Sequence, residues 1–130
     1  MHVASGAAAG AALRSRARAL ALGPLLHFAA DATPHEDIHS LRFELGTGIV
    51  LVVALAVRRG PLHPAVLGAL AAASPDVEHV VRLPRPGGRK LFPTHRGRGR
   101  HRVGAGVPSW LQLVAAGVIV GVLLSPRKEI

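Results

Sequence analysis

The residues best suited to chemistry lie in two short segments of a chain that is otherwise poor in acids. The sequence holds seven Asp and Glu residues and eight His. Six of the acids and four of the histidines fall within residues 27–44 and 76–79. Because the chain has no cysteine, imidazole and carboxylate groups would have to hold any metal, and together they suit zinc, manganese or iron. The pattern predicts a metal site built from His and Asp.

His27 and Asp31 form the centre of this predicted site. They are four residues apart, so on a helix they share one face and can bind a single ion. His35 and Asp37 follow within six residues. We expect His27, Asp31 and His35 to be metal ligands, and Asp37 to orient a ligand or accept a proton from metal-bound water. The alternative is a hydrogen-bonded helix end without a metal.

The elements that position these residues are predicted to be helices. Hydrophobic residues make up 49% of the chain and aromatic residues only 3%, a balance that favours packed helices over aromatic-rich strands. A length of 130 residues corresponds to a single domain over 1–130. We expect an all-α, membrane-associated bundle of four to five short helices, with a Pro/Gly/Arg-rich loop over residues 83–106 before the last helix.

Local signals predict where the helices begin and end. Residues 33–36 read Thr-Pro-His-Glu, a capping box that predicts a helix starting at Pro34. Ser74, followed by Pro and Asp, predicts a second start. Residues 59–61 read Arg-Gly-Pro and should end a helix, while the arginines of residues 14–18 suit a turn between two short helices.

This order of elements predicts that distant ligands converge. The helix from Pro34 leads away from the His27 end of the molecule, turns at residues 58–61, and residues 62–74 run back. The return would deliver Asp76 and His79 to the same end as His27, and a turn at residues 14–18 would bring His2 there too. We therefore expect Asp76 and His79 to be further metal ligands.

The basic loop supplies the remaining candidate residues. His95, or in its place His101, is expected to complete the metal site, and the guanidinium groups of Arg96 and Arg98 to bind an anionic substrate. The alternative is a basic loop that binds lipid headgroups or nothing specific. The formal net charge of +9 also admits nucleic acid as a partner, but the loop lacks the interleaved aromatic residues of a single-strand binding platform, which makes nucleic acid an unfavoured partner.

The distribution of apolar and basic residues predicts a membrane protein. Blocks of arginine bracket the uncharged stretches, as in loops between membrane segments. Residues 103–126 contain no charged residue and are long enough to span a bilayer, which needs roughly 20 residues. We expect a transmembrane helix at residues 107–125, with Trp110 near the interface, an integral location in the cell membrane and contact with membrane lipid. The alternative is a buried core helix.

With these elements in view, the chain resembles the small membrane-bound metal-dependent hydrolases, the group that includes the LexA-binding inner-membrane-associated hydrolase family. The resemblance extends over roughly residues 2–102. The order of the motifs along the chain resembles that of an uncharacterised branch of these small membrane proteins. Resemblance to that branch implies a shared fold rather than a particular activity. The matching elements are His2 before a small-residue run, His27-Phe28-Ala29-Ala30-Asp31-Ala32-Thr33-Pro34-His35-Glu36-Asp37, Ser74-Pro75-Asp76-Val77-Glu78-His79, and His95-Arg96-Gly97 with His101.

Two functional hypotheses follow. The first is an integral membrane protein with a His/Asp site for a divalent metal, zinc being expected, that hydrolyses an anionic, phosphoester-like substrate. The second is a non-catalytic membrane scaffold or lipid-interacting protein, in which the same cluster is a buried polar network that joins helix ends. A basic nucleic-acid-binding protein is a third, weaker hypothesis.

Overall fold

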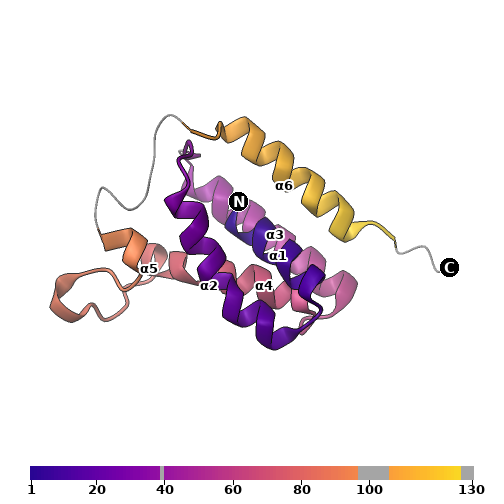
Figure 1. Cartoon of the computed structure of the whole chain (residues 1–130), viewed down its shortest axis with the longest axis horizontal. Coiled ribbons are helices and arrows are strands. Elements are labelled where there is room, and N and C mark those ends of the chain that lie inside the picture. The colour runs from indigo at the N-terminus through magenta and orange to yellow at the C-terminus, as the bar shows by residue number, and fades with distance from the viewer. Residues whose placement is uncertain (39, 97–105, 127–130) are drawn as a thin grey trace.

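The computed structural model describes residues 1–38, 40–96 and 106–126, and the regular secondary structure within them is helical apart from one isolated bridge (Figure 1). The all-helical class predicted from composition is therefore confirmed. The elements, in chain order, are α1 (His2–Leu13), α2 (Arg16–Ala32), α3 (Leu41–Arg59), α4 (Pro64–Ala73), η1 (Ser74–Asp76), α5 (Val77–Val80), η2 (Pro86–Gly88), η3 (Pro93–Arg96) and α6 (Ser109–Leu124).

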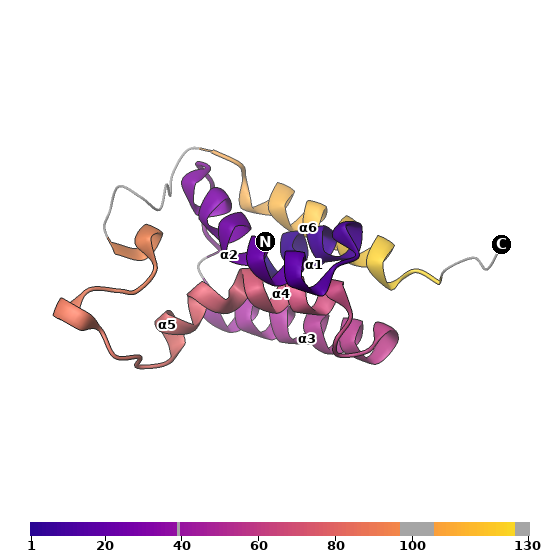
Figure 2. The same cartoon turned by 60° about the horizontal axis from the view of Figure 1, so that its bottom comes forward.

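Helix α4 is the centre of the packing, with α1 and α2 against one side and α3 beside it (Figure 2). Small residues make the close approach of α1 and α4 feasible. Gly6 faces Gly68 so closely that a Cβ atom on either glycine would overlap the backbone of the other helix. Gly10 faces the first turn of α4 in the same way. The Ala/Gly-rich sequence of both helices therefore sets the short distance between their axes.

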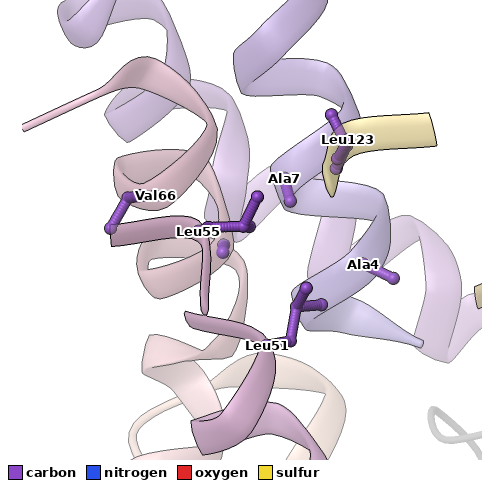
Figure 3. Close-up of a cluster of buried hydrophobic side chains, with 7 residues drawn as sticks. Ala4, Ala7, Leu51, Leu55, Val66 and Leu123 are labelled. Carbon is purple, nitrogen blue, oxygen red and sulfur yellow. The ribbon is translucent and has the colours of Figure 1, made fainter. Parts of the chain in front are cut away.

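The apolar core lies where α1, α3, α4 and α6 meet (Figure 3). Leu55 of α3 is fully buried there, between Ala7 of α1 and Val66 of α4. Leu123 adds a side chain from α6, and the guanidinium of Arg59 donates two hydrogen bonds, of 3.0 and 2.6 Å, to the Leu123 carbonyl oxygen. The basic end of α3 thereby satisfies a carbonyl at the end of α6, which has no partner within its own helix.

The capping box at residues 33–36 does not begin a helix, so that prediction is wrong. Helix α2 continues to Ala32, and Thr33 donates its hydroxyl back to the Ala29 carbonyl oxygen at 2.9 Å. Residues 34–36 instead form a parallel bridge with Val107. Helix α3 starts at Leu41, where the Ser40 hydroxyl accepts the Phe43 amide. Long-range pairing with Val107 therefore prevails over the local capping signal.

The other boundaries agree better with the sequence. Helix α3 ends at Arg59, with Gly60 at φ 90°, a conformation that favours glycine. Helices α1 and α2 are separated by a turn at Arg14 and Ser15, as predicted. Ser74 does not cap the start of a helix as predicted, because α4 runs directly into η1 and the Ser74 hydroxyl donates to the Ala71 carbonyl oxygen. The basic loop contains only short 3₁₀ turns in its described part, residues 83–96.

The predicted membrane span is wrong. In the described part of the chain, no helix combines the length and the apolar character that crossing a bilayer requires. Helix α6 has 16 residues, about 24 Å at 1.5 Å per residue against a hydrocarbon core of ~30 Å. Helix α3 is longer but contains charged residues at both ends. The transmembrane helix at residues 107–125 and the integral membrane location are therefore not supported.

The glycine contact between α1 and α4 predicts a site-specific effect of adding one methyl group. In Gly6→Ala the new Cβ atom would lie 2.5 Å from the Cβ atom of Ala72 and overlap the Gly68 backbone, so we expect a loss of about 1–3 kcal/mol of unfolding free energy. Gly46→Ala is the matched control, since nothing lies within 4 Å of its added Cβ; it should stabilise helix α3 by about 0.5–1 kcal/mol. Urea unfolding of both variants measures the difference, and equal effects would contradict the close packing.

Candidate metal centre

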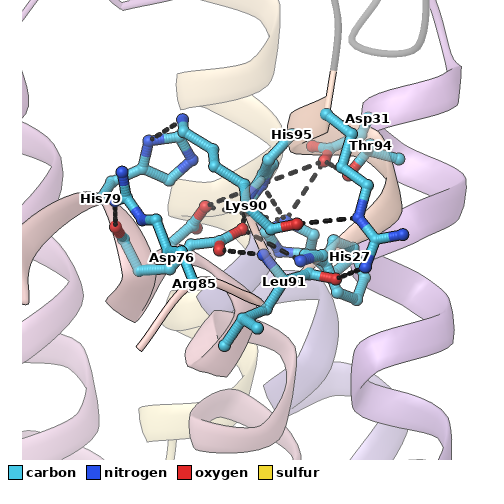
Figure 4. A network of polar contacts seen from close by, with 12 residues as sticks. His27, Asp31, Asp76, His79, Arg85, Lys90, Leu91, Thr94 and His95 are labelled. Atoms are coloured by element: carbon cyan, nitrogen blue, oxygen red, sulfur yellow. Dashed lines mark hydrogen bonds and ion pairs between the residues drawn. The ribbon is translucent and has the colours of Figure 1, made fainter. Parts of the chain in front are cut away.

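In the described residues, six ligand-type side chains gather where the first residue of α1, the last turns of α2, η1, α5 and η3 meet. Figure 4 shows His27, Asp31, Asp76, His79 and His95 among them. They form three overlapping groups of potential metal ligands, each with its ligand atoms within 4.8 Å of one another. The groups share members, so they form one cluster. The cluster residues are His2, His27, Asp31, Asp76, His79 and His95.

His27 is the most deeply buried member of the cluster, with no exposed surface. Its Nδ1 atom lies 2.8 Å from the carbonyl oxygen of Ala72. Because a carbonyl oxygen only accepts hydrogen bonds, Nδ1 must carry a proton and donate it. The opposite ring atom, Nε2, faces the other cluster residues with its lone pair. A metal-binding histidine is usually held in this way, by a hydrogen bond from its other ring nitrogen to a carbonyl or a carboxylate.

His95 is held in the same manner, by a carboxylate. Its Nδ1 atom donates to Glu78 Oε1 at 2.6 Å, so that Nε2 faces His27. Glu78 is itself buried and also accepts the backbone amides of Leu91 and Phe92, at 2.6 and 3.1 Å. Burial alone would raise the pKa of Glu78, but the amide of Leu91 and the ring of His95 stabilise the carboxylate and lower it. One carboxylate therefore attaches the loop over residues 91–95 to α5.

Asp31 presents its two oxygens to different partners. Oδ2 lies 3.2 Å from His27 Nε2 and accepts the hydroxyl of Thr94 at 2.6 Å. Oδ1 lies 3.4 Å from His2 Nε2. Only 3% of the Asp31 side chain is exposed, so nearly all of its polar contacts are with the protein.

Asp76 lies at the open side of the cluster, and 43% of its side chain is exposed. Its Oδ1 atom is 3.6 Å from His27 Nε2 and 3.7 Å from His95 Nε2. The two Nε2 atoms are 3.4 Å apart, and His95 Nε2 is 3.6 Å from Asp31 Oδ2. Two imidazole nitrogens and two carboxylate oxygens thus face one another from three separate parts of the fold.

Burial and neighbouring polar groups act in opposite directions on the pKa values of the cluster residues. Burial opposes charge on His27, but the hydrogen bond to Asp31 and the charge of Asp76 raise its pKa overall. The pKa of Asp31 is held below its usual range, because the His27 and Thr94 hydrogen bonds outweigh burial. Burial raises the pKa of Asp76. The hydrogen bonds and charges of neighbouring groups thus oppose the effect of burial on both His27 and Asp31.

His2 stacks on His27, with ring centroids 4.0 Å apart and an angle of 28° between the planes. Burial, together with the neighbouring His27, lowers the pKa of His2 to about 3 in spite of the attraction of Asp31. Its Nδ1 atom is buried without a hydrogen-bond partner in the described residues. The ring is thus a neutral imidazole, in the protonation state in which histidine binds metals.

The other predicted site residues lie apart from the two Nε2 atoms of His27 and His95 and the carboxylate oxygens of Asp31 and Asp76. His35 donates to the Thr33 carbonyl oxygen and its Nε2 atom lies 3.4 Å from Asp37 Oδ1, so these two residues pair with each other outside the ligand groups. His79 is exposed at the edge of the cluster and accepts a hydrogen bond from Lys90 at 3.0 Å. The guanidinium of Arg96 donates to two loop carbonyl oxygens. Arg98 lies outside the described residues.

Sequence reasoning did not identify Glu78 and Thr94 as site residues, although both hold cluster residues in place. Glu78 stands two positions after Asp76, and Thr94 directly before His95. Their nearness in sequence to two predicted ligands was the available signal. The sequence could not show that the loop about 15 residues after Glu78 folds back onto α5, because that depends on tertiary contacts.

Comparisons with protein-family models, curated proteins and solved structures give no match for this chain. The resemblance to small metal-dependent hydrolases therefore stays a prediction based on its motifs. The predicted hydrolase activity receives no support beyond those motifs. The geometry supports a narrower statement, that His and Asp groups in the described residues are placed where they could hold a metal ion.

Removing the charge of Glu78 should release the loop without unfolding the bundle. In Glu78→Gln the side chain loses one of its two acceptor oxygens and its negative charge, while the amides of Leu91 and Phe92 and the His95 ring still need acceptors. We expect amide hydrogen exchange at residues 91–95 to accelerate at least tenfold, with exchange in α1 and α4 unchanged. Unchanged exchange in the loop would show that Glu78 does not hold it.

The depressed pKa of His2 predicts a pH-dependent stability in the presence of a chelator. The unfolded chain binds a proton at His2 below pH ~6.5, whereas the folded chain does so only near pH 3. Stability should therefore fall as the pH drops through this window, by about 2 kcal/mol from His2 between pH 6.5 and 5. Urea unfolding at both pH values measures the fall, and His2→Phe should lack this part of it. The same pH dependence in both proteins would contradict the shift.

Proposed function

We propose that this protein binds a divalent transition-metal ion, with zinc the first expectation, through His27, Asp31, Asp76 and His95. The observation that carries the proposal is the convergence of two imidazole Nε2 atoms, 3.4 Å apart, with two carboxylate oxygens, each of which lies 3.2–3.7 Å from both Nε2 atoms. Both imidazoles are oriented by a hydrogen bond from Nδ1, one to a backbone carbonyl and one to a carboxylate.

The separations fit a tetrahedral ion. Zinc bonds of about 2.0–2.2 Å place neighbouring ligand atoms roughly 3.3–3.6 Å apart. The five separations that involve Nε2 of His27 or His95 differ from this range by about 0.1 Å at most. An ion at this position would also lie beside the carboxylate groups of Asp31 and Asp76.

The donor set favours a transition metal over calcium or magnesium. Calcium takes six to eight oxygen ligands and magnesium requires six in octahedral geometry, whereas imidazole nitrogen suits zinc, iron, nickel and copper. Two nitrogens with two carboxylate oxygens form a familiar ligand set for zinc. The exposed side of Asp76 leaves one approach to the ion open to solvent or to a small ligand.

The second candidate is a structural polar network that holds no ion. It is favoured by the hydrogen bonds that the cluster already makes, namely Thr94 to Asp31 and His95 to Glu78. In this case the cluster would join the end of α2 to α5 and the loop. The two candidates differ in whether purified protein retains metal.

Metal content of matched double variants tests the proposal. After chelation, dialysis against zinc and gel filtration, the wild-type protein should retain at least one ion per chain, measured by plasma mass spectrometry. His27→Ala with Asp31→Ala removes two central ligands and should reduce retention to background. His35→Ala with Asp37→Ala removes another His–Asp pair, outside the ligand groups, and should retain the ion.

Cobalt gives an independent readout of geometry. Co²⁺ in a tetrahedral site absorbs visible light strongly, and we expect this spectrum in the wild type and in the control pair. Wild-type protein that retains no zinc and gives no such spectrum, together with a destabilised His27/Asp31 variant, would instead establish the structural network.

A further inference from the structure

We propose that the cluster holds a second metal ion on His2, adjacent to the first, with the carboxylate of Asp31 bridging the two. The inference rests on the proposed function, since it adds an ion to the same cluster. Its structural basis is that His2 and His27 present their Nε2 atoms to different oxygens of the same carboxylate.

The number of donors exceeds what one ion can use. A tetrahedral zinc ion takes four ligands, and His27, His95, Asp31 and Asp76 already provide four. His2 is a fifth donor, and it belongs to a separate ligand group with His27 and Asp76, all within 4.8 Å. Because one imidazole nitrogen binds one ion, additional sharing must go through the carboxylates, each of which has two oxygens.

The ring geometry separates the two ions. An imidazole lone pair lies in the plane of its ring, so two histidines on one ion have planes that meet at that ion. The rings of His2 and His27 are stacked 4.0 Å apart and inclined by only 28°. Such planes meet far beyond the ~2.1 Å reach of a zinc–nitrogen bond. The two Nε2 atoms therefore point to neighbouring positions, and bridged pairs of ions typically lie about 3.5–4 Å apart.

The position of Asp31 matches a bridging role. Its Oδ2 atom lies 3.2 Å from His27 Nε2 and its Oδ1 atom 3.4 Å from His2 Nε2. Thr94 donates to Oδ2 and holds the carboxylate in this orientation. Asp76 lies beside both histidines, so it completes a set of His2, Asp31 and Asp76 for the second ion.

A purely structural role explains His2 less well. Its closest polar contact is the 3.4 Å approach to Asp31, and its Nδ1 atom is buried without a partner in the residues that the structure describes. A buried ring nitrogen without a hydrogen-bond partner is costly, and a phenyl ring would stack on His27 without that cost. A ligand role accounts for an imidazole at this position.

Zinc stoichiometry and the variant His2→Phe test the inference. Phenylalanine keeps the stacking surface and removes both nitrogens. We expect two zinc ions per chain in the wild type and one in His2→Phe, by calorimetric titration and by mass spectrometry after gel filtration. His79→Phe is the matched control, because His79 is the cluster histidine that neither set of ligands uses; it should retain two ions. With manganese in place of zinc, the wild type should give the spin-coupled spectrum of a bridged pair, and His2→Phe an uncoupled one.

The outcomes are distinct. If the wild-type protein binds one ion, the second site is overturned and the proposed function is still supported. If the wild-type protein binds no ion, both the second site and the proposed function are overturned. Two ions that persist in His2→Phe, with one lost in His79→Phe, would overturn the assignment to His2 and place the second ion at His79.

Discussion

The hydrogen bond from His27 to the carbonyl oxygen of Ala72 is the interaction on which the rest of the site depends. At 2.8 Å and fully buried, it fixes the end of α2 against the end of α4. It also determines which nitrogen of His27 carries the proton, so that Nε2 faces Asp31 and His95. The glycine contacts of α1 with α4 place His2 against the same ring. The close packing of small residues between α1 and α4 therefore also fixes how the His2 and His27 rings are oriented.

The cluster illustrates how a small helical protein tolerates buried charge. Burying an unpaired carboxylate or imidazolium would cost more than a fold of this size can offset, so each charged group has a partner. Asp31 has His27 and Thr94, and Glu78 has two amides and His95.

Particular residues show how far prediction from sequence reaches. His27 and Asp31 could be paired from sequence because helix geometry brings positions four apart onto one face. The end of α3 at Gly60 followed from backbone conformation alone. The capping box at residues 33–36 failed, because the backbone of that segment pairs with Val107. The transmembrane prediction failed because apolar composition does not determine helix length, and α6 ends after 16 residues.

The sequence by itself determined the helical class, the His–Asp pair on α2 and the turn that returns the chain towards Asp76. These follow from local geometry, in which spacing along the chain sets spacing in space. The sequence placed His2 and His95 at the His27 end, but only the tertiary structure shows how they contact the His27 ring, that His35 does not, and that Glu78 and Thr94 hold cluster residues in place. Such contacts join residues up to about 70 positions apart, and they depend on how closely the glycine and alanine surfaces of the helices pack.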